Sequence, residues 1–135
     1  MVKNPDILSA DELFSDLSSK FKDDKELLKK AYNFASDGHL NQKRASGEPY
    51  ITHPLQVALY LSELSMDLET IIAAILHDLI EDTDITYKNI KKEFGTDVAN
   101  IVDGVTKLDK IQYNTNEEAK AEAIRKMVIA MSKDI

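Results

Sequence analysis

One histidine and three carboxylates stand close together in the middle of the chain. His77 and Asp78 directly follow the wholly apolar run 71–76, and Glu81 and Asp82 come within one helical turn of them. In an apolar helix an ionisable side chain must be paired, neutralised or bound to metal, because burying an isolated charge is costly. A mixed set of imidazole nitrogen and carboxylate oxygen suits Mn²⁺, Fe²⁺ or Zn²⁺ better than Ca²⁺. The spacing therefore makes this helix end a candidate metal site.

The same residues also have an ordinary interpretation. His77 and Asp78 could form a simple hydrogen-bonded pair at a helix end, followed by a solvated turn at 81–82. Spacing alone leaves both interpretations open. His53, at the start of another predicted helix, is the candidate for a further nitrogen ligand. His39 is interpreted as a helix-end residue satisfied by backbone carbonyls, and it is not placed in the site.

A basic loop is the second candidate for chemistry. Arg44 is one of only two arginines, and it stands with Ser46 in a segment rich in turn-forming residues, 40–50. A guanidinium can bind a phosphate with two parallel hydrogen bonds or stack on a base. The alternative is a surface residue paired with Glu48. The chain contains no glycine-rich phosphate loop, dinucleotide fingerprint or nucleophile elbow, which leaves metal-assisted hydrolysis or binding alone.

Helices must position these side chains, because apolar residues recur at helical spacing and no segment alternates like a strand. A capping box at 9–12 starts the first helix, and Thr52 is expected to cap the helix that carries Pro54 in its first turn. Gly38 is expected to mark a helix end or a bend. The predicted helices span 9–20, 24–39, 52–64, 68–82, 86–94, 96–108 and 116–131.

Length and charge narrow the class of protein. A chain of 135 residues fits a single domain, 1–135, in which 1–22 forms a peripheral N-terminal helix. The net charge of −7 argues against direct nucleic-acid binding and against binding to anionic membranes. The run 71–76 is too short to span a bilayer, and the N-terminus has no apolar signal segment, so a cytoplasmic location is expected.

Several blocks in order resemble one family. The segments 44–54, 76–83, 94–95, 102–108 and 125–135 closely resemble the N-terminal hydrolase domain of RelA/SpoT-type bifunctional stringent-response enzymes. The resemblance implies an all-α, HD-superfamily helical bundle. It also implies Mn²⁺-dependent removal of the 3′-pyrophosphate from the alarmones ppGpp and pppGpp, which yields GDP or GTP and pyrophosphate.

The resemblance also assigns a role to individual residues. Those that match the family's motifs are the metal ligands His53, His77 and Asp78, the water-activating acids Glu81 and Asp82, and the nucleotide-binding Arg44 and Ser46. The chemistry is consistent, since a metal ion acidifies water while a carboxylate accepts the proton.

Two departures from the family pattern shape the expectations. Ala45 stands where many members carry a lysine or another polar residue, and the helix that bears a fourth ligand, an aspartate, lies beyond Ile135. We therefore expect the domain to lack its C-terminal part, with low metal occupancy, little turnover and possible self-association through an uncovered apolar groove. Alternatives are a catalytically silent HD-like module that binds nucleotide or partner domains, a general nucleotide phosphohydrolase, and a purely structural bundle.

Overall fold

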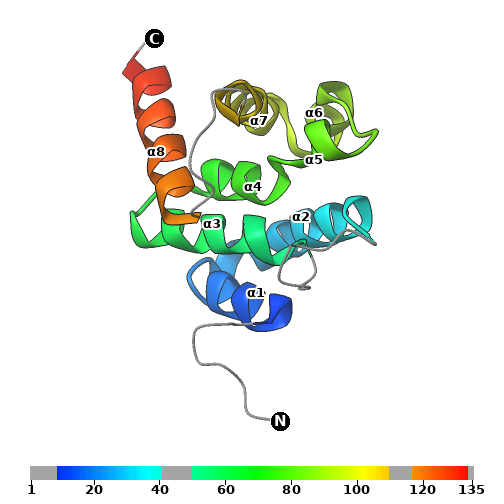
Figure 1. Cartoon of the computed structure of the whole chain (residues 1–135). Helices are drawn as coiled ribbons and strands as arrows, with labels where there is room; N and C mark the ends of the chain where they lie inside the picture. Colours follow the sequence, from blue (N-terminus) through cyan, green and yellow to red (C-terminus); the bar gives the residue numbers. More distant parts are fainter. Residues whose placement is uncertain (1–8, 41–49, 110–116, 134–135) are drawn as a thin grey trace.

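The protein is built from helices, as predicted. The computed structural model describes residues 9–40, 50–109 and 117–133, except for the side chains of 108, 109 and 130–133. In this part of the chain there are helices and no strands (Figure 1). The elements in chain order are α1 (Ala10–Ser19), the short 3₁₀ helix η1 (Lys22–Asp24), α2 (Lys25–Gly38), α3 (Thr52–Glu63), α4 (Leu68–Leu76), α5 (Leu79–Asp82), α6 (Tyr87–Phe94), α7 (Thr96–Asp109) and α8 (Glu117–Lys133).

Helices α3 and α4 pack side by side at the centre of the bundle (Figure 1). Helix α1 packs on α3 and α2 packs on α4, so both lie on one side of this pair. Helix α7 packs on α4, α6 packs on α7, and α8 packs on α3. The two central helices carry the histidines of interest, and the others cover them.

The central position of α4 follows from its sequence. Asp67 caps its first turn by accepting a hydrogen bond from the backbone N–H of Thr70, at 3.1 Å. Every residue from Thr70 to Leu76 is buried, as the all-round apolar run predicts. Each fully buried Leu or Ile contributes about 1.5–3 kcal/mol to folding, so this helix fixes the frame on which the site is built.

The predicted helix starts and stops are largely confirmed. Ser9 caps α1 by accepting from the N–H of Glu12, and its hydroxyl donates to the Glu12 carboxylate. Thr86 forms a capping box at the start of α6, and Gly95 ends that helix with a φ of 98°. Of the predicted N-terminal segment 1–22, residues 1–8 lie outside the described residues; α1 lies at the outer edge of Figure 1, and its Leu13 and Leu17 side chains are buried.

One local expectation is wrong and a second is refined. Thr52 does not cap α3, because Ile51 occupies the capping position without a side-chain hydrogen bond and Thr52 is the first helical residue. Gly38 is the last residue of α2, as expected, but His39 rather than Gly38 takes the capping position. The reason for glycine at 38 is space, because a Cβ there would overlap Leu79 and approach Ile85 Cδ1 to 3.1 Å.

The predicted helix over 68–82 is broken in the structure. The backbone N–H of His77 donates to the carbonyl of Ala74, three residues earlier, and ends α4 at Leu76. A new turn, α5, begins at Leu79, where the N–H of Asp82 donates to the carbonyl of Asp78. The break leaves His77 and Asp78 in the junction between two helices.

No described helix is long and apolar enough to cross a membrane.

Candidate metal centre

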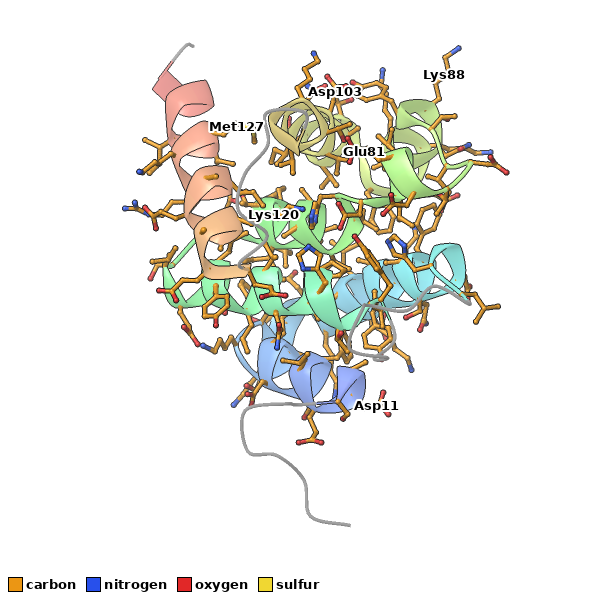
Figure 2. The ribbon with its side chains drawn as sticks, in the orientation of Figure 1. Asp11, Glu81, Lys88, Asp103, Lys120 and Met127 are labelled. Carbon is orange, nitrogen blue, oxygen red and sulfur yellow. The ribbon has the colours of Figure 1, made fainter. Side chains whose placement is uncertain are left out.

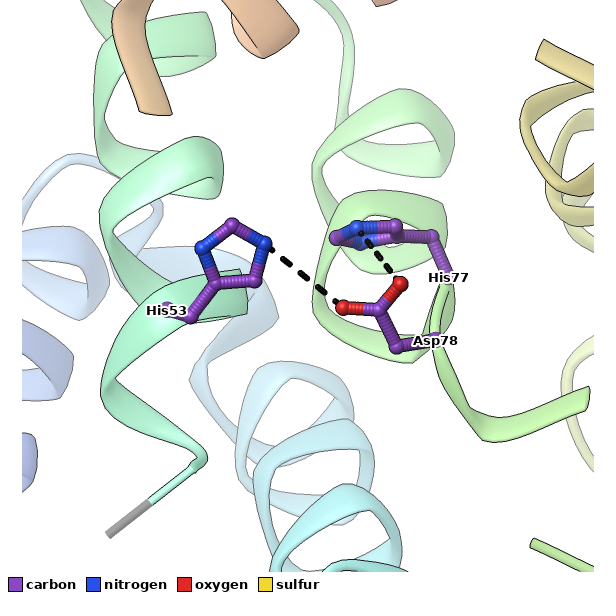
Figure 3. A group of neighbouring side chains, drawn as sticks. All are labelled: His53, His77 and Asp78. Carbon is purple, nitrogen blue, oxygen red and sulfur yellow. Dashed lines mark ion pairs between the residues drawn. The ribbon is translucent and has the colours of Figure 1, made fainter. Parts of the chain in front are cut away.

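Three of the predicted residues meet between α3 and the α4–α5 junction. His53 lies in the first turn of α3, while His77 and Asp78 lie in the junction (Figure 3). All three are buried, and each offers one ligand atom such that these atoms lie within 4.8 Å of one another. Residues 24 positions apart in the chain are brought together because α3 and α4 pack against each other.

Asp78 lies between the two imidazoles. Its Oδ1 lies 3.2 Å from Nε2 of His77, and its Oδ2 lies 3.6 Å from Nε2 of His53 (Figure 3). The two rings are 5.7 Å apart between centroids. Two nitrogens and a carboxylate therefore converge on one small volume inside the protein.

The contacts of His77 determine which of its ring nitrogens carries the proton. Its Nδ1 lies 2.5 Å from the carbonyl oxygen of Ala74, and a carbonyl can only accept, so Nδ1 carries a proton. In the neutral ring Nε2 is then the unprotonated nitrogen. This Nε2 is fully buried and makes no hydrogen bond within the described part of the chain. A histidine held through Nδ1 by a carbonyl, with Nε2 directed at a carboxylate, has the arrangement of a metal ligand.

His53 is held in a similar way by a residue of α8. Its Nδ1 lies 3.3 Å from Oε1 of Glu117, which leaves Nε2 facing Asp78. Burial and the neighbouring His77 lower the pKa of His53 to about 4, although Asp78 and Glu117 act in the opposite direction. His53 is therefore neutral near pH 7, the form that binds a metal ion.

Asp78 is stabilised in its charged form. Tyr50 donates a hydrogen bond of 2.7 Å to Oδ2, and the ammonium group of Lys120 lies 3.6 Å from Oδ1. Burial alone would raise the pKa of Asp78, but His77, Lys120 and the Tyr50 hydrogen bond outweigh it and lower the pKa below its ordinary value. The same carboxylate raises the pKa of Tyr50, in addition to the effect of burial, so the phenol stays protonated and donates.

Glu81 and Asp82 lie on α5 at the edge of this cluster, and neither belongs to the group of three ligands. Both residues are exposed. Partial loss of hydration and the negative charge of Asp78 raise the pKa of Asp82, while His39 and a hydrogen bond with Tyr50 lower it less strongly. Asp82 is thus a solvent-accessible carboxylate whose proton affinity is increased by the buried one.

The other predicted contacts have different outcomes. Arg44 and Ser46 lie outside the described residues, as does Glu48. His39 is buried at the end of α2, and its ring lies 4.7 Å from that of Tyr50, between centroids. It supports the tyrosine that holds Asp78, and it lies outside the group of His53, His77 and Asp78.

Three residues around the cluster were not identified from the sequence. Tyr50 lies in the segment 44–54, which resembles the family, but only Arg44, Ser46 and His53 of that segment were assigned a role. Glu117 and Lys120 belong to α8, where charged residues are typical of a solvent-facing surface, and they reach the site only because α8 packs on α3. Lys120 is labelled in Figure 2 on the N-terminal half of α8. No local pattern distinguishes them from other charged residues of a helix.

The residues present fit a metal ion. Nε2 of His77 is buried without a hydrogen bond among the described residues, and it faces a carboxylate oxygen, which also can only accept. A cation between these atoms would satisfy both. The cluster of His53, His77 and Asp78 can therefore hold a metal ion through two nitrogens and one or two oxygens.

Comparison with known proteins agrees with this geometry. Residues 31–135 match the model of the HD domain family. The chain is 50% identical over 127 residues, 94% of its length, to the guanosine-3′,5′-bis(diphosphate) 3′-pyrophosphohydrolase of Aquifex aeolicus, of which it covers 18%. It is 53% identical over 108 residues, 80% of its length, to the bifunctional (p)ppGpp synthase/hydrolase SpoT of Escherichia coli K12, of which it covers 15%.

A third relative carries a different name. The GTP pyrophosphokinase of Streptomyces coelicolor is 50% identical over 107 residues, which is 79% of this chain and 12% of that protein. The chain thus spans less than a fifth of the length of each of these relatives. The matched family and the named relatives together show that the chain belongs to the HD domain family, as part of the RelA/SpoT-type proteins.

Proposed function

We propose that this domain hydrolyses ppGpp and pppGpp at the 3′-pyrophosphate, with Mn²⁺ bound by His53, His77 and Asp78. The observation that carries the proposal is the buried convergence of these three side chains in a chain about half identical to proteins named for this activity. When bound, the metal ion would lower the pKa of a water molecule and polarise a phosphoryl oxygen.

The chain's own residues prepare the site for this chemistry. Ala74 and Glu117 hold the two imidazoles so that each presents Nε2 to the cluster. Tyr50 holds the carboxylate of Asp78 at Oδ2, which limits its rotation. Because these groups are fixed before a ligand arrives, little reorganisation is needed on binding.

Asp82 is the proposed proton acceptor, and Glu81 assists in orienting the attacking water. The pKa of Asp82 is raised, so its carboxylate accepts a proton more readily than an ordinary aspartate, and it is accessible to solvent. Water attacks the phosphorus attached to the 3′-oxygen, the bond between them breaks, and the proton passes to the 3′-oxygen. The products are GDP or GTP with a free 3′-hydroxyl, and pyrophosphate. Arg44 and Ser46 are proposed to bind the nucleotide.

The test is ppGpp hydrolysis followed by chromatography, with Mn²⁺, Zn²⁺ or Mg²⁺ added to metal-free protein. We expect GDP and pyrophosphate to form slowly with Mn²⁺, as the little turnover expected from the sequence implies, and Asp82→Asn to lower that rate about a hundredfold or more, the usual effect of losing a general base. Asp84→Asn is the matched control, since Asp84 is an exposed aspartate two residues away. Binding of ppGpp without turnover in the unmodified chain would instead favour the silent nucleotide-binding module.

A further inference from the structure

Lys120 places a positive charge beside the proposed metal site. Its Nζ lies 3.6 Å from Oδ1 of Asp78, the oxygen that also lies 3.2 Å from Nε2 of His77. The Lys120 side chain is only 16% exposed, so water screens this charge weakly. The ammonium group is therefore part of the immediate surroundings of the ligand cluster.

A lysine in this position opposes the metal ion that the cluster attracts. Both cations would be drawn to Asp78, and two positive charges beside one carboxylate repel each other. A site made only to hold a metal ion would be stronger without Lys120. The arrangement is favourable once an anion joins the site, because an anion bound beside the metal is attracted by both positive charges.

We propose that Lys120 binds a phosphate group of the substrate. It pairs with Asp78 when the cluster holds no metal ion, and it pairs with a phosphate oxygen when a metal ion and the nucleotide are bound. This assignment rests on the proposed function and adds to it a substrate-binding residue from α8. Lysine is an ordinary phosphate ligand, acting as a point charge on a flexible stem.

The structure allows this exchange without movement of the helix. Glu117, one turn earlier on α8, contacts His53 and fixes the start of the helix at the cluster. The stem of Lys120 has four rotatable carbon bonds, so its ammonium can leave Asp78 while α8 stays in place. With a net charge of −7, the chain as a whole does not attract a highly anionic nucleotide, so local cations must hold it, and Lys120 is one of them.

The test is the variant Lys120→Gln, compared with the unmodified chain in two binding measurements. Calorimetric titration with Mn²⁺ alone is expected to show several-fold tighter binding in the variant, because a repelling charge is gone. Equilibrium dialysis of ppGpp with saturating Mn²⁺, with both proteins also carrying Asp82→Asn so that the nucleotide is not consumed, is expected to show binding about tenfold weaker or more, the usual effect of losing a charged hydrogen bond. Chromatography of the dialysed samples monitors any hydrolysis.

Two further variants separate local from general effects. Lys120→Arg keeps the charge and is expected to retain most ppGpp affinity. Lys126→Gln removes the same charge from an exposed position on the same helix, and it is expected to change neither affinity. The opposite signs of the two changes in Lys120→Gln distinguish phosphate binding from a structural role, since a damaged helix would weaken both ligands.

The outcomes are separable from those of the proposed function. Unchanged ppGpp affinity in Lys120→Gln, or loss of both affinities, would overturn the role of Lys120 while leaving ppGpp as the substrate. Binding of inorganic pyrophosphate, measured with Mn²⁺ in the same way, tests the case in which ppGpp is not the substrate. Suppose that the unmodified chain binds pyrophosphate but not ppGpp, and that Lys120→Gln no longer binds pyrophosphate. Lys120 is then a phosphate ligand and the proposed substrate is wrong. If the chain binds neither anion, the role of Lys120 is overturned as well.

Discussion

At the scale of single residues, the properties of the site depend on groups that touch the ligands. Tyr50 is the clearest example, because its hydroxyl donates to Oδ2 of Asp78 at 2.7 Å. We expect Tyr50→Phe to weaken Mn²⁺ binding about tenfold or more, the usual effect of removing a hydrogen bond that orients a ligand. Titration of the metal-free protein with Mn²⁺ measures this.

The chain offers a matched control for this substitution. Tyr87, a partly buried residue of α6, also uses its hydroxyl to donate a hydrogen bond, to Asn100 at 2.6 Å. Tyr87→Phe removes the same atom and is expected to leave Mn²⁺ affinity unchanged. Equal affinities in Tyr50→Phe and the unmodified chain would show that the hydroxyl does not position Asp78.

The buried His53 makes the stability of the metal-free chain dependent on pH. Its pKa is lowered to about 4 from an ordinary value of 6.5, because burial disfavours the charged ring. The unfolded chain therefore binds a proton between these values while the folded chain does not. The contribution of neutral His53 to the free energy of unfolding is fully present above about pH 6.5 and is lost as the pH falls toward 4. The loss is about 3 kcal/mol at most.

Urea unfolding from pH 7.5 to 4.5, in the presence of a chelator, measures this effect. We expect the free energy of unfolding to fall with acid in the unmodified chain and to fall less in His53→Gln. Below about pH 4 protonation of Asp78 adds to the loss, since its pKa is also below the ordinary value. Parallel curves for the two proteins would contradict the assignment to His53.

The sequence predicts ligands better than it predicts the residues that hold them. His53, His77 and Asp78 stand out because ionisable side chains beside apolar runs require a partner, and the family resemblance joins them. Glu117 and Lys120 could not be identified, because their role depends on where α8 packs, and that is decided by contacts between distant segments. The roles of Glu81 and Asp82 remain predictions that the geometry supports only through their position on α5.

At the scale of elements, the approach of α2 to α5 fixes the junction that carries the ligands. Gly38 permits this approach, because a Cβ there would overlap Leu79, which follows Asp78 directly and is fully buried. We expect Gly38→Ala to lower the free energy of unfolding by about 1–2 kcal/mol, as overpacking outweighs the gain in helix propensity. Urea unfolding measures the change.

A second readout shows whether the strain reaches the site. Displacement of Leu79 is expected to move Asp78, so Gly38→Ala should also weaken Mn²⁺ binding. Asn33→Ala serves as the control, since Asn33 is exposed on the same helix and is expected to change neither quantity by much. A stabilised Gly38→Ala protein would mean that Leu79 repacks freely.

Helix boundaries were predictable where side chains define them locally. The capping residues Ser9 and Thr86 act over three residues, so their patterns are sufficient. The break after Leu76 could not be predicted, because it depends on bonds from both the backbone and the ring of His77 to one carbonyl. Periodicity alone favours a continuous helix there, and the break is what directs Asp78 toward His53.

At the scale of the whole molecule, the site joins three parts of the bundle. His53 comes from α3, His77 and Asp78 from the α4–α5 junction, and Glu117 from α8. The all-α class followed from helical periodicity and the family resemblance, whereas this meeting of helices depends on packing. A ligand that binds such a site stabilises the folded state alone, since the unfolded chain does not bring these side chains together.

Metal binding should therefore raise the stability of the whole domain. At a free Mn²⁺ concentration one hundred times the Kd, we expect the free energy of unfolding to rise by about 2.7 kcal/mol and Tm by several degrees. Thermal unfolding with and without Mn²⁺ measures this, and Asp78→Asn should abolish most of the increase. Asp103→Asn removes an exposed carboxylate paired with Lys107, and this variant should retain the increase in stability with Mn²⁺. An equal increase in both variants would mean that Mn²⁺ binds elsewhere, because only Asp78 belongs to the buried cluster.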